Sequence, residues 1–88
     1  MNETYQCRAV TVEYGAYTAC YSKLSGSTHI LDAFPGEVVS LICNGVANSE
    51  PEIVSRIEQA TGERLPPGAT KDILDSLVAF GLIDLATL

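Results

Sequence analysis

Residue types that commonly carry enzyme chemistry are few in this chain of 88 residues, and their spacing is unfavourable. His29 is the one histidine, and a histidine general base needs a carboxylate that orients it. Asp32 follows three residues later, which in a strand places it on the opposite face from His29. The eleven acidic residues form neither a calcium-loop pattern nor a helical His/Glu pair, and the glycines form no phosphate-binding loop. The sequence therefore predicts no catalysis, no metal site and no cofactor.

One serine lies in a segment that carries chemistry in other proteins. Asp75-Ser76-Leu77 is similar to the segment on which acyl carrier proteins receive phosphopantetheine. In carrier proteins that serine begins a helix near the middle of the chain and two further helices follow it. Here Ser76 falls in the middle of the last expected helix, and the first third of the chain is expected to be strands. An acyl-carrier role for Ser76 is kept as an alternative that this context opposes.

The three cysteines, at positions 7, 20 and 43, lack the short spacing of metal ligands. Because their number is odd and each falls in an expected strand or helix, we expect all three to be reduced and buried. The opening residues, Met1 to Tyr5, contain neither the cationic nor the apolar region of a secretory signal. These two observations together predict a cytoplasmic protein.

The charge balance of the chain limits its partners. Five Lys and Arg residues stand against eleven Asp and Glu residues, which gives a net charge of −6, and the cations are scattered singly. Nucleic acids and acidic membrane surfaces are bound by clustered cations, so both are disfavoured as partners. No apolar run approaches the ~18 residues of a membrane span. An acidic surface suits a protein or peptide partner, and it also keeps a small protein in solution.

Alternating side chains predict three strands in the first third of the chain. Within 5–14, Val10, Val12 and Tyr14 alternate with Ala9, Thr11 and Glu13, which is the period of a half-buried strand. Within 16–24, Tyr17, Ala19 and Tyr21 alternate in the same way with Thr18, Cys20 and Ser22. Gly15 separates these two runs. Ser25-Gly26-Ser27 is a turn signal, and the β-branched stretch Thr28 to Leu31 is the third strand. Short connections between the three favour an antiparallel meander.

Three helices are expected after the strands. Asp32 is predicted to cap the first, and Ser49 and Glu52 form a capping box in which each side chain bonds an end amide of the second. Thr70 is expected to cap the third helix, and Gly81 to stop it. The stripes expected to be buried are Phe34, Val38, Leu41 and Ile42; then Ile53, Val54, Ile57 and Ala60; then Ile73, Leu74, Leu77, Val78 and Phe80.

Strands followed by helices predict an α+β fold of order βββααα, in which a three-stranded sheet forms one layer and three helices the other. A three-helix cluster with a β-ribbon is a winged helix-turn-helix-like arrangement, here with the ribbon first. We expect residues 1–88 to form one domain.

Two segments, one around the third expected strand and one at the end of the third expected helix, resemble the PqqD-like family. Ser25-Gly26-Ser27-Thr28-His29-Ile30-Leu31-Asp32 fits the pattern SGxTHxLD, and Leu74 to Ile83 fits LxxLxxxGLI. Between them, the first helix ends in Leu41-Ile42-Cys43-Asn44-Gly45. Within the family, the chain looks most like peptide chaperones of the HPr-rel-A type. These are similar to the recognition elements used in making ribosomally synthesised, post-translationally modified peptides.

The resemblance implies a binding module without catalysis of its own. In related proteins, the leader of a precursor peptide adds as a further strand to the third strand and lies against the third helix. Carried onto this sequence, the peptide-binding residues are Ser27, Thr28, His29, Ile30 and Leu31 on the strand, and Ile73, Leu74, Leu77 and Val78 on the helix. The partners implied are a precursor leader peptide and either a peptide-modifying enzyme or an HPr-kinase-related protein. The same open edge could pair with a second copy, so a homodimer is left open.

A winged-helix transcription regulator is the other alternative. It shares the expected fold, so the fold does not separate it from a peptide chaperone. The shortage of cations argues against it.

Overall fold

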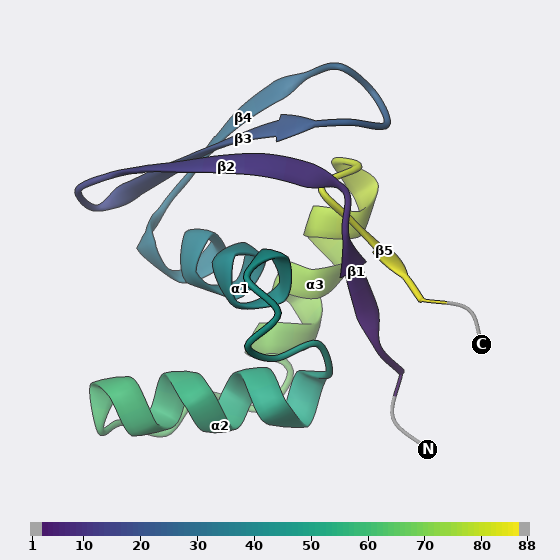
Figure 1. Ribbon diagram of the computed structural model, residues 1–88. Helices are drawn as coiled ribbons and strands as arrows, with labels where there is room; N and C mark the ends of the chain where they lie inside the picture. The colour runs from purple at the N-terminus through teal and green to yellow at the C-terminus, as the bar shows by residue number, and fades with distance from the viewer. Residues whose placement is uncertain (1–2, 87–88) are drawn as a thin grey trace.

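The computed structural model describes residues 3–86, with five strands and three helices in that range (Figure 1). Met1 and Asn2, which begin the segment used to argue against a secretory signal, lie outside the described residues. In chain order the elements are β1 (Tyr5–Cys7), β2 (Ala9–Tyr14), β3 (Tyr17–Ser22), β4 (Thr28–Leu31), α1 (Ala33–Cys43), α2 (Glu50–Thr61), α3 (Ala69–Ala79) and β5 (Ile83–Leu85). The predicted α+β fold, with a three-stranded antiparallel sheet followed by three helices, is confirmed.

The three-stranded sheet has the order β2-β3-β4, with β3 in the middle and both pairings antiparallel. Val10 lies opposite Tyr21 and Tyr14 opposite Tyr17, so β2 and β3 form a hairpin with a two-residue loop. Gly15 takes a positive φ of 58° at the first position of that loop, which suits a glycine in a tight hairpin. The strand β4 lies at one edge of this sheet.

The expected first strand, over 5–14, is divided into two strands that belong to different sheets. The chain changes direction at Arg8, whose N–H donates to Leu82 O at 2.9 Å while its carbonyl accepts from Lys23 N–H at 2.8 Å. Before this point β1 pairs with β5 at the other end of the chain. The strand β5 was not predicted from the sequence, because a three-residue strand is too short to show a period and its partner is distant in sequence.

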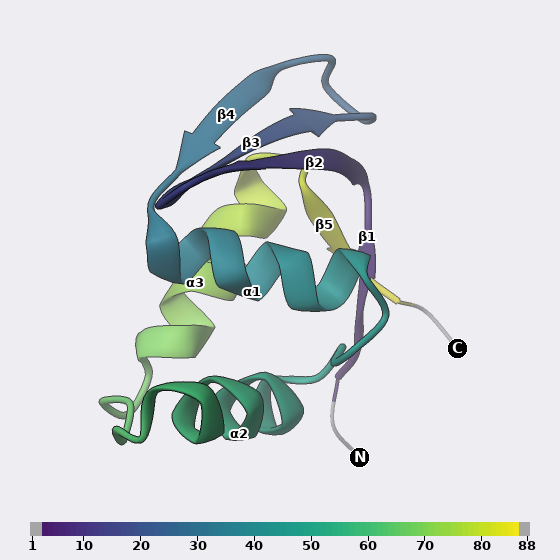
Figure 2. The ribbon, with the colours of Figure 1, turned by 60° about the vertical axis from the view of Figure 1, so that its left-hand side comes forward.

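The helices lie on one side of the β2–β3–β4 sheet, with α1 directly beneath it and α2 farthest from it (Figures 1 and 2). The side chains of the sheet that face α1 are small: Thr18, Cys20 and Ser22 are buried. A close approach makes this necessary, because a Cβ on Gly36 would come within 2.5 Å of Thr18 Oγ1. The alternation expected in the strands is present, and the valine and tyrosine side chains of β2 and β3 point away from the helices into solvent.

A single apolar cluster fills the space between the sheet and the three helices. Its buried members are Tyr5, Ala9, Cys20, Leu31, Val38, Val39, Ile42, Ala47, Ile53, Ile57, Leu74, Leu77, Leu82 and Ile83. Of the stripe expected on α2, Ile53 and Ile57 are buried, Val54 is half-buried and Ala60 is exposed. Ala60 lies outside the cluster because α2 is the outermost layer and buries only a narrow stripe.

Two of the three predicted helix starts differ in detail. Gly68 is the N-cap of α3, and the helix begins at Ala69. Thr70 therefore lies inside the first turn, where its hydroxyl is buried and has no hydrogen-bond partner within residues 3–86. At the start of α2, Ser49 Oγ donates to Glu52 Oε1 at 3.0 Å, so the two side chains bond each other rather than the end amides. Asp32 is the N-cap residue of α1 as predicted, without a side-chain capping bond.

The expectation that all three cysteines are reduced is wrong for two of them. Cys7 at the end of β1 and Cys43 at the end of α1 form a disulfide, with their Cα atoms 4.8 Å apart. Their separation of 36 residues and their places in different elements gave no sign of pairing in the sequence. Cys20 is a free and buried thiol. The disulfide removes the cysteine argument for a cytoplasmic location, which otherwise stays a prediction.

Within the described range, no helix has both the length and the apolar character that crossing a membrane requires.

Candidate functional site

The free edge of β4 is the first part of the candidate site. Ser22 N–H donates to Ser27 O at 2.8 Å at the start of the β3–β4 pairing, which sets the alternation of hydrogen bonds along it. In an antiparallel pair every second residue exchanges backbone bonds with its partner and the others direct theirs outward. His29 and Leu31 therefore bond β3, whereas Thr28 and Ile30 direct their N–H and C=O groups to the free edge. No other strand within residues 3–86 pairs with that edge.

The end of α3 is the second part. The rings of His29 on β4 and Phe80 directly after α3 are stacked, with centroids 4.7 Å apart and planes inclined by 17°. Close by, Ser22 Oγ donates to Gly81 O at 2.8 Å. Gly81 has a positive φ of 75°, and a Cβ there would lie 2.9 Å from Ser22 Oγ. These contacts hold the last turn of α3 against the sheet.

The helix residues predicted to bind peptide are divided by the structure into three groups. Leu74 and Leu77 are 0% and 1% exposed, so both side chains belong to the core. Ile73 is half-buried and packs at the margin of the core. At about 100° per residue, Ile73 and Phe80 lie on one flank of the buried stripe. Val78, which is 36% exposed, lies on the other flank.

The two flanks of α3 face different strands. Because the ring of Phe80 stacks on His29 of β4, the flank of α3 that carries Phe80 lies beside β4. Lys71, on the same flank as Val78, lies close to Tyr5 of β1, which contributes to raising the pKa of Lys71. The structure therefore brings Ile73 to the β4 side and does not bring Val78 there. The spacing of apolar residues predicts a stripe on the helix, but it does not predict which neighbouring strand each margin of the stripe faces.

The strand residues predicted to bind peptide differ in their exposure, and Ser27 lies directly before β4. Ser27, Thr28 and Ile30 are exposed, and the side chain of Ile30 is 66% exposed on the outer face of the sheet. His29 is half-buried because it faces the helices and packs on Phe80. The side chain of Leu31 is buried in the core and its backbone groups bond β3, so Leu31 offers no group to the free edge.

Phe80 is the residue that sequence reasoning missed at this site. It was counted among the buried residues of the third helix, but 42% of its surface is exposed. The signal that could have singled it out is its position seven residues after Ile73, on the same flank of the helix, and directly before the helix-ending Gly81.

The surroundings of two titratable side chains shift their pKa values. Burial raises the pKa of the Cys20 thiol, which keeps it protonated and unreactive at neutral pH. Lys71 Nζ is paired with Asp75 Oδ1 at 3.1 Å on the exposed side of α3, and this hydrogen bond raises the pKa of Lys71. Among the described residues, no group of His, Cys, Asp and Glu side chains could hold a metal ion.

Comparisons with known proteins support the fold. No family model matches the chain, and no curated protein matches its sequence. A solved structure described as TbiB1 in complex with the TbiA(beta) leader peptide does match, with a TM-score of 0.70. The fold is similar to that of TbiB1. The match covers 94% of this chain and 99% of TbiB1 at 18% sequence identity, and TbiB1 was solved with a leader peptide bound. At this identity the likeness establishes the fold.

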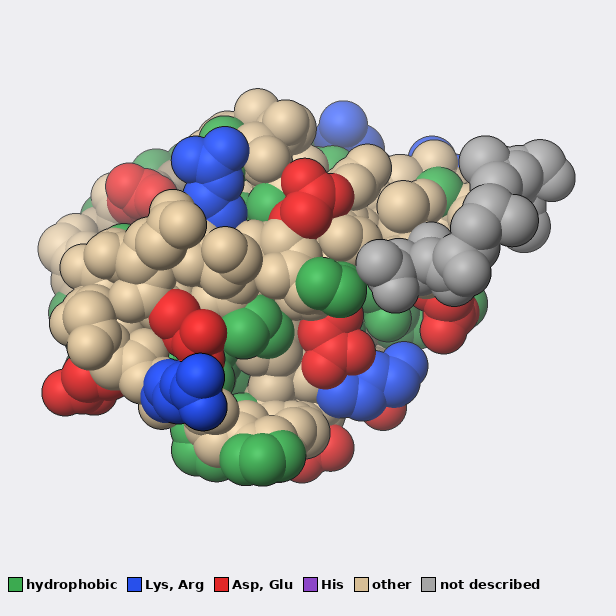
Figure 3. Space-filling model, turned by 90° about the horizontal axis from the view of Figure 1, so that it is seen from below, with side chains coloured by type: hydrophobic (Ala, Val, Ile, Leu, Met, Phe, Trp, Pro, Cys, Tyr) green, Lys and Arg blue, Asp and Glu red, His purple; other side chains and the backbone are tan. Residues whose placement is uncertain are grey.

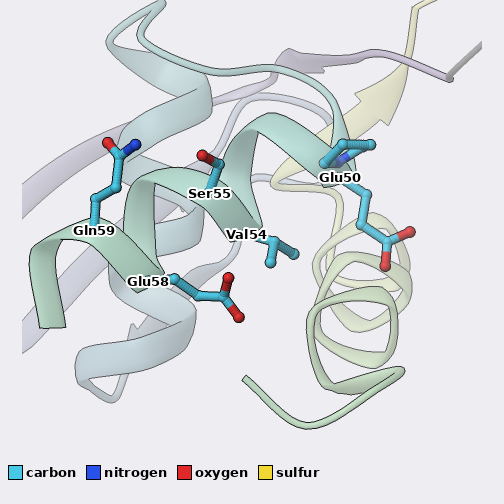
Figure 4. A pocket seen from close by; sticks show the side chains of 6 residues that line it. Glu50, Val54, Ser55, Glu58 and Gln59 are labelled. Atoms are coloured by element: carbon cyan, nitrogen blue, oxygen red, sulfur yellow. The ribbon is translucent and has the colours of Figure 1, made fainter. Parts of the chain in front are cut away.

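A surface hollow along α2 is another place where a ligand could be sought. It is lined by Glu50, Pro51, Val54, Ser55, Glu58 and Gln59, all from one helix (Figure 4). Glu58 Oε2 there already accepts a hydrogen bond from Leu65 N–H at 2.8 Å. On this side of the molecule, acidic and basic side chains are interspersed (Figure 3). The hollow lies at the opposite end of the molecule from β4 (Figures 1 and 2) and shares no residue with the candidate site.

Proposed function

We propose that this chain is a PqqD-like recognition element that binds the leader of a ribosomally made precursor peptide and has no catalysis of its own. The observation that carries the proposal is the free edge of β4, where Thr28 and Ile30 direct backbone groups outward beside the exposed ring of Phe80. The likeness in fold to TbiB1, which was solved with a leader peptide, supports the same conclusion.

In the proposed complex the leader adds as a fourth strand next to β4. An open strand edge offers N–H and C=O groups that an extended peptide can pair with, and pockets for alternate side chains supply specificity. Thr28 and Ile30 together offer four such backbone groups. At a net ~1 kcal/mol each, these bonds do not exceed the cost of association. Two or three buried leader side chains at ~1.5–3 kcal/mol each bring the complex into the micromolar to sub-micromolar range.

Successive side chains of an added strand point to opposite faces of the sheet. Every second leader residue would therefore face the helices, where Ile73 and Phe80 offer partly exposed apolar surface. The residues between them would lie beside Ile30 on the outer face. The proposed leader is thus an extended segment with apolar residues at alternate positions on the side that contacts α3.

The bound leader is presented to a second protein in this proposal. That partner is a peptide-modifying enzyme or an HPr-kinase-related protein, as the family resemblance implies. A transcription regulator of the same fold stays the less favoured alternative, since the net charge of −6 opposes phosphate binding.

The test is affinity capture of peptides from the native cell extract by three forms of the protein, read by mass spectrometry. Ile30→Pro removes the outward N–H of residue 30 and leaves the bonds between β3 and β4 in place. Ile30→Thr is the matched control, because it removes the apolar side chain but keeps that N–H. We expect a small peptide to be retained by the wild type and by Ile30→Thr, and to be lost with Ile30→Pro. Equal retention by all three forms would contradict strand addition at β4.

A further inference from the structure

The outer face of the β2–β3–β4 sheet carries an apolar surface that extends over all three strands and shares only Thr28 and Ile30 with the proposed peptide site. Eight side chains point outward from the three strands, and none of them is charged. They are Val10, Val12, Tyr14, Tyr17, Ala19, Tyr21, Thr28 and Ile30, and we call this set the outer sheet face. Six of them are large apolar or aromatic side chains that are each about half exposed or more. No described part of the chain covers them, because the helices all lie on the other side of the sheet (Figure 1).

The size of the outer sheet face suits an interface of moderate strength. Half-exposed tyrosine, valine and isoleucine side chains leave on the order of 600 Å² of this face accessible. A standard protein interface buries about 800 Å² on each partner. Tyrosine is enriched at such interfaces and charged side chains are depleted from their centres, as is the case here.

The charged residues at the two ends of the sheet are complementary to those of a second copy whose strands run in the opposite direction. Lys23 continues β3 at one end of the sheet, and Asp32 continues β4 at the other. Both side chains are exposed. Counting every second residue along each strand places both of them on the outer face of the sheet. A two-fold axis running across the strands would stack one outer sheet face on another with strand directions reversed. Asp32 of each copy then lies at the same end as Lys23 of the other copy.

We infer that the outer sheet face binds a second copy of this chain in a face-to-face, two-fold symmetric dimer. The contact is charge-free at its centre and is flanked by a Lys23–Asp32 pair at each end. Both β4 edges stay open in this arrangement, so each copy can still accept a peptide. Because the face is smaller than a standard interface and the chain has a net charge of −6, the dimer forms in the micromolar range or above.

Sedimentation velocity of the full chain over a range of concentrations tests this inference. Val12 is 48% exposed on β2, the strand farthest from the β4 edge, so Val12→Lys probes the outer sheet face without touching the proposed peptide site. Val46→Lys is the matched control, since Val46 is 42% exposed in the loop between α1 and α2. Lysine lowers the negative charge of the chain in both variants, so increased repulsion between copies cannot explain a loss of the dimer.

We expect the wild type and Val46→Lys to dimerise reversibly, and Val12→Lys to raise the dimer dissociation constant by more than about tenfold. Lys23→Glu and Asp32→Lys should each weaken the dimer, and the double exchange should recover it. A wild type that stays monomeric at every concentration would overturn the inference and leave the face to a different protein. A dimer that survives Val12→Lys would place the contact elsewhere, and one lost only with Ile30→Pro would place it at the β4 edge.

If Val12→Lys fails to unfold cooperatively, the double charge exchange decides the question alone. Recovery of the dimer by Lys23→Glu with Asp32→Lys, after loss in each single variant, requires the end-to-end arrangement. Additive weakening in the double variant contradicts it. Peptide capture by Val12→Lys should equal that of the wild type, which separates this test from that of the proposed function.

Discussion

The ring of His29 on β4 lies stacked on the ring of Phe80 after α3, and this contact joins the edge strand to the helix that would cover a bound peptide. Phe80 is therefore placed both to hold the last turn of α3 and to contact a peptide strand beside β4. His29, which lacks the orienting carboxylate of a general base, thus has an aromatic ring as its partner in the structure.

Replacing Phe80 with Ala should weaken peptide binding about tenfold, because the apolar contact between the ring and the peptide, which contributes ~1.5 kcal/mol, is lost. Val78→Ala is the matched control, since Val78 is comparably exposed but lies on the β1 side of α3. Isothermal titration with the captured peptide measures both. If Val78→Ala weakened binding as much as Phe80→Ala, the peptide would not lie on the β4 side of the helix.

Truncating Leu77 should affect stability rather than recognition. Its side chain is buried in the core, and Leu→Ala changes at such sites cost about 2–5 kcal/mol of unfolding free energy. Ile73→Ala, at the margin of the same cluster, should cost less and should weaken peptide binding. Urea unfolding followed by circular dichroism measures the two costs. A smaller loss for Leu77→Ala than for Ile73→Ala would show that the core boundary on α3 is misplaced.

Gly36→Ala should destabilise the protein by about 1–3 kcal/mol, although alanine is the better helix former. The added Cβ would come within 2.5 Å of Thr18 Oγ1 and 3.0 Å of Thr18 Cβ, so α1 must move away from β3. Thermal unfolding checks this expectation, and Gly45→Ala is an informative comparison. Gly45 has a positive φ of 72° and open space around it, so its substitution strains the backbone without a clash. A stabilised Gly36→Ala variant would mean that α1 and β3 are not closely packed.

Loss of the Cys7–Cys43 disulfide should lower the free energy of unfolding by about 2–4 kcal/mol, because the bond closes a loop of 36 residues between β1 and α1. The double variant Cys7→Ser with Cys43→Ser, compared with the wild type under reducing conditions, separates loss of the bond from the replacement of sulfur by oxygen. Peptide binding should be unchanged in the folded double variant, since neither cysteine lies at the β4 edge. Equal melting temperatures for oxidised and reduced wild type would contradict a stabilising bond.

The order of strands and helices could be predicted from the sequence because local signals specify it. Gly15 marks the hairpin between β2 and β3, and the alternation on either side of it defines the two strands. The pairing of β1 with β5 and the disulfide could not be predicted, because both join segments distant in sequence and neither leaves a periodic signal.

The candidate site could be predicted in part for the same reason. The edge strand was found from the segment around Thr28 and Ile30, which is contiguous in sequence. The helix side was not resolved, because spacing places Leu77 and Val78 on one apolar stripe while only packing decides which is buried and which margin faces β4. The contact of Phe80 with His29 depends on tertiary structure alone.

Amide hydrogen exchange is the most direct test of whether a peptide pairs with the outward backbone groups of β4. It is measured residue by residue on the protein with and without the captured peptide. The amides of Thr28 and Ile30 should exchange at least about tenfold more slowly when the peptide is bound, since both gain a hydrogen bond. The amides of His29 and Leu31, which already bond β3, should change little. Unchanged exchange at Thr28 and Ile30, with new protection at another strand or helix, would contradict strand addition at this edge.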